Sequence, residues 1–115
     1  MRLKSEIWVK AYVRRLSGSG RMAYVVRHGD DDAGAIYIRI NRLDGTSDLF
    51  GPAPASLSGM ETDRRWIAFF KGEARPDSEV DAYLEREGRN DPDLWIIEVE
   101  SRDGGHGLEG WLTTL

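Results

Sequence analysis

The sequence predicts an α+β fold: a mostly antiparallel sheet of about five strands with two helices on one face. Two segments, 5–17 and 78–88, place apolar residues at helical spacing and polar residues on the opposite side. Residues 35–43 alternate between apolar and polar and lead into an Asp-Gly pair, which is typical of a β-hairpin. The expected order is α-β-β-β-β-α-β, and hairpin links between the first strands exclude a mainly parallel sheet.

The first helix is expected over residues 5–17, with Ser5 as its N-cap and Gly18 after its end. One side of this helix is a continuous polar stripe made of Glu6, Lys10, Arg14 and Ser17. The opposite side is apolar and contains Trp8, Val9, Tyr12, Val13 and Leu16. A strand is the competing interpretation, because alternate residues from 7 to 13 are also apolar. The unbroken polar stripe favours the helix.

Three strands are expected to follow as a meander, at 22–28, at 35–43 and directly after the Asp-Gly pair. Asp-Gly suits a two-residue type I′ turn, because both turn positions need a positive φ. This turn would set Ile40 opposite Leu49. It would therefore place both residues, together with Ile38, on the buried face of the sheet.

The second half of the chain completes the expected fold. Its elements are a surface loop at 51–63, a fourth strand at 65–71, a helix at 78–88 and a fifth strand at 94–101. The fourth strand is apolar on both faces, so it is expected in the interior of the sheet or under a helix. The second helix is expected to be capped by Asp77 or Ser78 and followed by Gly88 as its C′ residue.

Length and composition suit one soluble domain, since 115 residues with 40% hydrophobic and 31% charged side chains can bury a core. We expect that domain over 1–104 and a loosely ordered, glycine-rich tail over 105–115, in which Trp111 is a candidate for contact with a partner. The absence of cysteine excludes disulfides, thiolate catalysis and cysteine-ligated metal sites. No stretch resembles a signal peptide or a membrane span, so a cytoplasmic protein with no membrane partner is expected.

The charges are sorted along the chain. Residues 1–42 hold nine Lys or Arg against four acids, whereas the whole chain has 16 basic and 20 acidic residues. This asymmetry indicates electrostatic pairing, either between the two halves of the domain or with a partner. The basic residues available for a partner are Lys10, Arg14, Arg21, Arg27, Arg39 and Arg42. They could also follow a phosphate backbone, but the overall acidity disfavours nucleic acid.

No catalytic, metal or cofactor motif stands out, so we expect no cofactor and no metal site, and a non-catalytic role is favoured over an enzymatic one. Residues 30–32 are three adjacent aspartates in an expected turn, and they cannot all face one ion. Glu98 and Glu100 share one strand face and most simply meet arginines of the basic half. A small-molecule or enzymatic site is expected near the 51–63 loop, with His28, Arg39, Asp48 and Glu98 as polar candidates.

Long strings of the sequence resemble one known family. They read GDDDAGAIYIRINRLDG at 29–45, LFGPAP at 49–54, RRW at 64–66 and DAYLEREGRNDPDLWIIEVESRDG at 81–104, besides the IWVKAYVRR near the start. With these strings the chain resembles the bacterial domain of unknown function 1491 family, which consists of short single-domain proteins. The resemblance covers nearly the whole chain except its tail. It implies no activity, cofactor or catalytic residue.

Three functions follow from these observations. A non-catalytic protein-interaction module, either a homodimer or a small adaptor, is favoured, because the charges are sorted along the chain. Interfaces are also enriched in arginine and tryptophan, and the chain contains four tryptophans. The first alternative is a small-molecule-binding domain or small enzyme with its site near the 51–63 loop. The second is a weak nucleic-acid binder that uses the basic N-terminal half.

Overall fold

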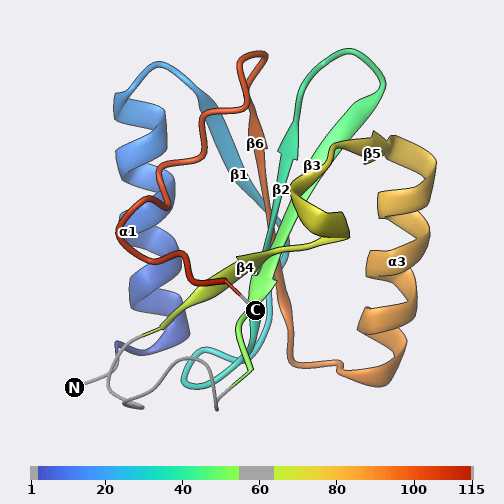
Figure 1. The fold of residues 1–115 in the computed structure, drawn as a ribbon. Coiled ribbons are helices and arrows are strands. Elements are labelled where there is room, and N and C mark those ends of the chain that lie inside the picture. The colour runs from blue at the N-terminus through green and yellow to red at the C-terminus, as the bar shows by residue number, and fades with distance from the viewer. Residues whose placement is uncertain (1–2, 55–63, 115) are drawn as a thin grey trace.

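The structure is a computed structural model that describes residues 3–54 and 64–114. Its elements are α1 (Ser5–Gly18), β1 (Met22–Arg27), β2 (Ile36–Asn41), β3 (Thr46–Pro52), β4 (Trp66–Ala68), the 3₁₀ turn η1 (Phe70–Gly72), β5 (Arg75–Pro76), α3 (Asp77–Asn90) and β6 (Trp95–Glu100). The predicted α+β class and the mostly antiparallel sheet are confirmed (Figure 1). No helix among the described residues is both long and apolar enough to cross a membrane.

The strand order in the sheet is β1-β6-β2-β3-β4, with the short β5 paired to β3. The β2–β3 hairpin is confirmed, but the predicted meander of three strands is wrong, because β6 lies between β1 and β2. β6 is antiparallel to β1 and parallel to β2. Its residues are buried on both faces, whereas most residues of β1 are exposed. An apolar strand gains most at the centre of a sheet, so β6 is interior and β1 forms an edge.

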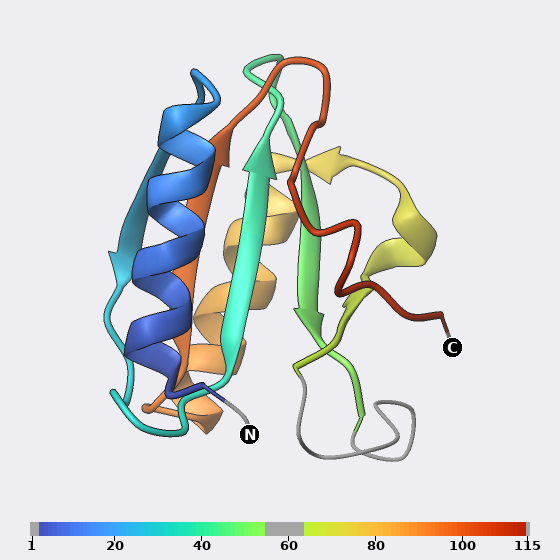
Figure 2. The same ribbon diagram turned by 90° about the vertical axis from the view of Figure 1, so that its left-hand side faces the viewer.

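The two helices lie on opposite faces of the sheet, which corrects the expectation that both cover one face (Figure 2). α1 packs Trp8 and Tyr12 against the face that carries Ile36, Ile38 and Ile40. α3 packs its apolar stripe, Val80 and Leu84, against a second cluster that contains Leu49, Leu94 and Ile96. The continuous apolar run at the start of β6 needs cover on both faces, and one helix on each side provides it.

The β2–β3 turn has three residues, Leu43 to Gly45, instead of the predicted two. The amide of Arg42 donates to the carbonyl of Thr46 at 3.1 Å, and the turn residues Leu43 and Gly45 have φ of 63° and 91°. The extra residue shifts the register, so that Leu49 lies opposite Arg39 and Asp48 opposite Ile40. A shift of one residue turns every side chain to the other face. Leu49 is therefore buried under α3, on the face opposite Ile38 and Ile40.

Leu43 offers a direct test of this turn, because a leucine with φ of 63° is in the left-handed region and is largely exposed. Leu43→Asn is expected to raise the free energy of unfolding by about 0.5–1 kcal/mol, since asparagine tolerates this region better. Leu43→Val, the control, is expected to destabilise the protein. Urea unfolding of the three proteins measures both effects. A two-residue turn, without a positive φ at position 43, would give the opposite order.

The predicted helix ends need two corrections. α1 is preceded by Lys4 as its N-cap, and Ser5 lies inside the first turn, where its hydroxyl donates to the carbonyl of Gly34 at 2.7 Å. The first helical amides are satisfied by carbonyls of the aspartate turn, since Glu6 N–H donates to the carbonyl of Asp31 at 2.9 Å. α3 begins after Pro76 without a side-chain cap and continues through Gly88 to Asn90. A Cβ at Gly88 would lie 2.3 Å from an Arg27 guanidinium nitrogen, so a larger residue there would displace the end of the Arg27 side chain.

The strand predicted at 65–71 is shorter than expected and lies at an edge. β4 ends at Ala68, because Phe70 and Lys71 adopt φ of 57° and 56° and form η1. β4 pairs with β3 alone among the named strands of the described residues, so it closes the sheet on the side opposite β1. The expectation of an interior strand is therefore wrong, whereas the other alternative, cover by a helix, is met at Trp66, which packs against Trp8 of α1.

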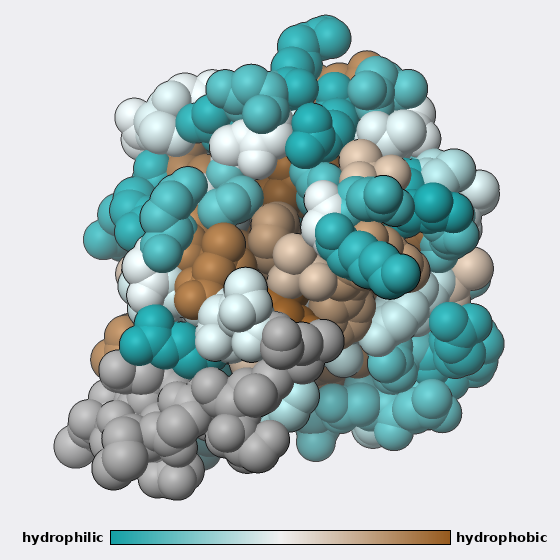
Figure 3. Space-filling model, viewed as in Figure 1, coloured by the Kyte–Doolittle hydropathy of each residue, from teal (hydrophilic) through white to brown (hydrophobic). Residues whose placement is uncertain are grey.

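The C-terminal segment, which we expected to be loosely ordered, packs beside α1 on the same face of the sheet (Figure 2). Leu108 is fully buried, and the Tyr12 hydroxyl donates to the carbonyl of His106 at 2.6 Å. Further along, Trp66 donates its amide to the carbonyl of Trp111 at 2.8 Å. Figure 3 shows hydrophobic residues gathered in the middle of this view of the molecule, with hydrophilic residues around them. α1 and the C-terminal segment together cover this face of the sheet.

Candidate functional site

A groove lies between β1 and α3 in the part of the chain that the structure describes. Its volume is about 740 Å³, and its lining comes from β1, β2, β6 and one side of α3: Val26, Arg27, Arg39, Asp81, Leu84, Glu85, Ile96 and Glu98. The floor is the sheet face opposite α1, and the wall is α3. Because Arg27 donates from β1 to the carbonyls of Gly88 and Pro92, it closes the groove at the C-terminal end of α3.

The groove exists because α3 covers only part of its face of the sheet. α3 packs on Leu49 of β3, Tyr37 of β2 and Ile96 of β6, and no described element covers β1 on this side. In Figure 2, β1 has α1 in front of it and no helix behind it. Met22 and Val26 of β1 are consequently 63% and 54% exposed, which is high for apolar strand residues. A bulge between Val25 and Arg27 brings both Val26 and Arg27 into the groove.

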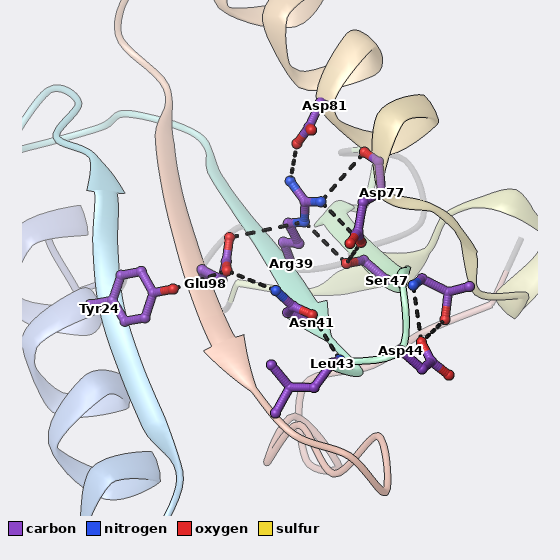
Figure 4. Close-up of polar contacts among 10 residues, drawn as sticks. Tyr24, Arg39, Asn41, Leu43, Asp44, Ser47, Asp77, Asp81 and Glu98 are labelled. Atoms are coloured by element: carbon purple, nitrogen blue, oxygen red, sulfur yellow. Dashed lines mark hydrogen bonds and ion pairs between the residues drawn. The ribbon is translucent and has the colours of Figure 1, made fainter.

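Arg39 lies at the centre of a charge network on the groove floor (Figure 4). Its guanidinium bonds to the carboxylate of Asp81, and it lies 3.2 Å from a carboxylate oxygen of Asp77. Nε donates to the hydroxyl of Ser47 at 3.1 Å and lies 3.9 Å from Glu98 Oε1. Burial alone would lower the pKa of Arg39, but the hydrogen bonds to Asp81 and Asp77 outweigh it and raise that pKa. Arg39 therefore stays charged and ties β2 to the start of α3 and to β6.

The other oxygen of Glu98 is held from β1 and β2. The Tyr24 hydroxyl lies 3.0 Å from Glu98 Oε2 and 3.2 Å from Glu100 Oε2, and Asn41 Nδ2 donates to Glu98 Oε2 at 3.2 Å (Figure 4). Burial and the hydrogen bond to Glu98 raise the pKa of Tyr24 to about 12, so this hydroxyl remains a donor at neutral pH. The predicted meeting of Glu98 with an arginine of the basic half is thus present, with Arg39 as the partner.

The groove is acidic although it contains arginines. Arg27 and Arg39 face a larger set of carboxylates on the floor, on the wall and at the rim: Asp77, Asp81, Glu85, Glu98 and Glu100. The charge of Arg39 is already matched by Asp77 and Asp81. A ligand that enters the groove therefore meets excess negative charge beside an apolar strip of Val26, Leu84 and Ile96, in which only Val26 is exposed.

The basic residues predicted for a partner are largely engaged within the chain. Arg21 pairs with Asp103 at 3.0 Å, Arg42 with Asp48 at 2.8 Å, and Arg39 with the acids of α3. These acids lie after residue 42, so the basic N-terminal stretch pairs with the more acidic remainder of the chain. Among the other candidates, Lys10 lies 3.7 Å from Glu6, Arg27 bonds to carbonyls, Arg14 is exposed on α1, and Trp111 packs against Trp8.

The Arg21–Asp103 pair predicts an acid-dependent contribution to stability. The amide of Gly105, then Arg21 and Ser101, hold the pKa of Asp103 well below its usual 3.8. A depressed pKa stabilises the fold at every pH above 3.8, and this contribution is lost as the pH falls through the lower folded value. Asp103→Asn is therefore expected to lower Tm at pH 7 and to differ less from the parent protein as the pH falls below 3.8.

Thermal unfolding between neutral and strongly acidic pH measures this contribution of Asp103. Glu73→Gln, which removes another exposed carboxylate, is the control and is expected to change Tm little at any pH. A difference between Asp103→Asn and the parent that stays constant across the acid range would contradict the role of the Asp103 charge.

The four polar candidates from the sequence do not converge on one site. Arg39 and Glu98 meet in the groove, but Asp48 lies on the other face with Arg42. His28 directly follows β1 and lies apart from the other three candidates. It is 2.7 Å from Asp31, and its ring packs against Trp95. Residues 55–63 of the loop expected beside the site lie outside the described residues, and none of the groove residues belongs to 51–54.

His28 also belongs to a cluster with Glu6 and Asp31, whose candidate ligand atoms lie within 4.8 Å of one another. His28 and Asp31 are exposed. Glu6 is held near them by a hydrogen bond from its backbone N–H to the carbonyl of Asp31. The capping of α1 by the aspartate turn therefore accounts for this proximity.

Val26, Asp81 and Glu85 of the groove, and Tyr24 beside it, were not predicted from the sequence as functional residues. One signal was present: the strand at 22–27, MAYVVR, is apolar at successive positions. Such a strand needs cover on both faces. This need, together with the acids at alternating positions of β6, could have pointed to this surface.

Comparison with known proteins places the chain in a family. The family model described as "Protein of unknown function (DUF1491)" matches residues 3–109. The chain belongs to the DUF1491 family. The resemblance predicted from its sequence strings is thereby confirmed, and a comparison with curated proteins finds no match.

Solved structures of DUF1491 proteins have the same fold. A crystal structure of a DUF1491 family protein from Caulobacter crescentus CB15 is 37% identical, with a TM-score of 0.79 over 98% of this chain and 99% of that one. The solution structure of protein Atu0922 from A. tumefaciens is 41% identical, with a TM-score of 0.75 over 88% and 87%. An NMR structure of a DUF1491 protein from C. crescentus is 38% identical, with a TM-score of 0.74 over 92% of each chain. All three solved structures share the fold of this chain, and their descriptions name no activity.

Proposed function

We propose that the protein is a non-catalytic interaction module that binds a partner protein in the groove between β1 and α3. The observation that carries this proposal is the uncovered apolar side of β1, with Met22 and Val26 more than half exposed beside a groove of about 740 Å³. Exposed apolar surface rimmed by polar residues is typical of protein-binding sites. Tyr24, which has both an aromatic ring and a hydroxyl, is of the residue type that interfaces favour.

Charge supports a different protein, and not a second copy, as the occupant. Two copies that met through this groove would bring the same excess of carboxylates together, which is unfavourable. Pairing of two β1 edges around Tyr24 would also set Arg21 of each copy opposite Arg27 of the other, and β1 is bulged before Arg27. Both arguments favour a partner with complementary, positive charge.

The same contacts count against the two alternative functions. Arg39, the most buried cation of the groove, is occupied by Asp77, Asp81 and Ser47, so its contacts are those of a structural residue. A nucleic-acid binder would need the basic residues of positions 1–42, of which Arg21, Arg39 and Arg42 are neutralised by acids later in the chain.

Neutral polar substitutions on β1 test the proposal. The double variant Met22→Gln/Val26→Asn removes apolar contacts without a change in charge, and Ile7→Gln on α1 is the matched control, since Ile7 is 49% exposed. Each protein, immobilised, is incubated with native cell extract, and retained proteins are quantified. We expect at least one protein that the parent and Ile7→Gln retain and that the double variant loses at least about tenfold, the effect of losing about 1.4 kcal/mol. If no retained protein depends on Met22 and Val26, the proposal is wrong.

A further inference from the structure

We infer that the part of the partner that enters the groove is a basic amphipathic α-helix, which lies over β1 and alongside α3. This inference rests on the proposed function and adds the shape and charge of the bound segment.

The two faces of the sheet are covered unequally. The face with Ile36, Ile38 and Ile40 is covered by α1 and the C-terminal segment (Figure 2), which contributes Leu108, although Val25 at the β1 edge of this face is 41% exposed. The opposite face is covered by α3, together with Phe69 and Phe70 of the η1 segment, over β3, β2 and the inner side of β6. The layer that contains α3 therefore lacks a second element above β1.

The missing element has the dimensions of one helix. β1 lies two strands away from β2, which is about 10 Å at the usual strand spacing of ~4.8 Å. Packed helices lie about 8–10 Å apart, so a helix centred above β1 would pack against α3. The six residues of β1 extend over roughly 20 Å, the length of a helix of about thirteen residues.

The chemistry of the groove selects a basic helix with one apolar stripe. An apolar strip, in which Val26 is 54% exposed and Leu84 and Ile96 are buried, follows the line between β1 and α3. Carboxylates lie on both sides of this strip, with Glu85 on the α3 wall and Glu98 on the floor. A helix with apolar residues at positions i, i+3, i+4 and i+7 and with Lys or Arg beside them matches both features.

Addition of a strand to the edge of β1 fits less well. The bulge between Val25 and Arg27 interrupts the regular edge, and the Arg27 side chain crosses from β1 to the end of α3. A strand at the edge would also leave the exposed Val26 side chain uncovered. Val26 and the groove acids belong to the face of the sheet, and a helix is the element that packs on a face.

Two peptides of about fifteen residues test the inference on the intact protein. The probe is a helix-forming peptide with a leucine stripe flanked by lysines, and its counterpart has the same stripe flanked by glutamates. Binding is measured by fluorescence anisotropy, and its location by amide chemical-shift changes. We expect the lysine peptide to bind at least about tenfold more tightly than the glutamate peptide and to shift amides of β1 and of the Asp81–Glu85 side of α3.

Two charge-reversal variants sharpen this test. Glu85→Lys in the groove is expected to weaken the lysine peptide at least about fivefold, whereas Glu73→Lys, with the same change in net charge outside the groove lining, is expected to change it less than about twofold. Equal binding of both peptides, equal effects of both variants, or shifts away from β1 and α3 would overturn the inference. If partner retention depends on Met22 and Val26 while the lysine peptide fails to bind, the helix inference falls and the proposed function stands. If both fail, both fall.

Discussion

Trp66→Ala is expected to lower the free energy of unfolding by about 3–5 kcal/mol, one of the two largest effects that the structure predicts. Trp66 is 2% exposed and stacks on Trp8 of α1 with ring centroids 4.4 Å apart. Its indole N–H donates to the carbonyl of Ile36 at 2.9 Å, and its backbone bonds to the C-terminal segment. Its removal leaves a cavity where β4, α1 and the C-terminal segment meet.

Urea unfolding measures this loss, and Trp66→Phe separates its two causes. Phenylalanine keeps most of the apolar contact with Trp8 but leaves the carbonyl of Ile36 without its donor, so a loss of about 1–2 kcal/mol is expected. A Trp66→Ala protein that lost less than Trp66→Phe would show that Trp66 does not hold the three segments together.

Arg39→Met is expected to lower the free energy of unfolding by about 2–4 kcal/mol. The substitution keeps apolar volume under α3 but leaves the carboxylates of Asp77 and Glu98 near each other without their common cation. The loss falls short of the largest values for buried pairs because Asp81 is exposed to water. Chemical denaturation of the variant and the parent gives the magnitude.

A second substitution tests the cause of that loss. Glu98→Gln alone is expected to destabilise the parent protein, because it weakens the network around Arg39 and Tyr24. In the Arg39→Met background the same change is expected to restore about 1 kcal/mol, since it removes a partly buried charge that has lost its partner. If Glu98→Gln is equally harmful in both backgrounds, Arg39 and Glu98 are not coupled, and the account of the network is wrong.

Much of the fold could be predicted because its signals are local. The polar stripe of α1, the apolar stripe of α3 and the alternation of β2 each lie within one segment, and each element is present close to its predicted bounds. The hairpin register was wrong by one residue because Asn41 and Asp44 accept hydrogen bonds from the amides of Leu43 and Thr46 and stabilise a three-residue turn. An Asp-Gly pair alone does not reveal those side-chain bonds.

The position of β6 and the separation of the helices could not be predicted in the same way. They depend on which strands bury both faces, which is a property of the whole sheet. The groove follows from these long-range choices: β6 is inserted next to β1, α3 is placed on the other face from α1, and Arg39 meets Asp81 across that face. Charge sorting predicted the internal pairing as one of two possibilities, and the geometry of Arg21, Arg39 and Arg42 selects it.

Site-specific photo-crosslinking in the native cells tests the binding surface most directly. A photoreactive amino acid is placed at Val26 on the groove floor, at Met22 on the same strand, or at Ile7 on α1 as the control. The structure predicts that Val26 and Met22 crosslink to the same protein, distinct from this chain, and that Ile7 does not. Crosslinks to that protein from Ile7 alone, or from β1 only to a second copy of this chain, would contradict the assignment of the groove as a partner-binding site.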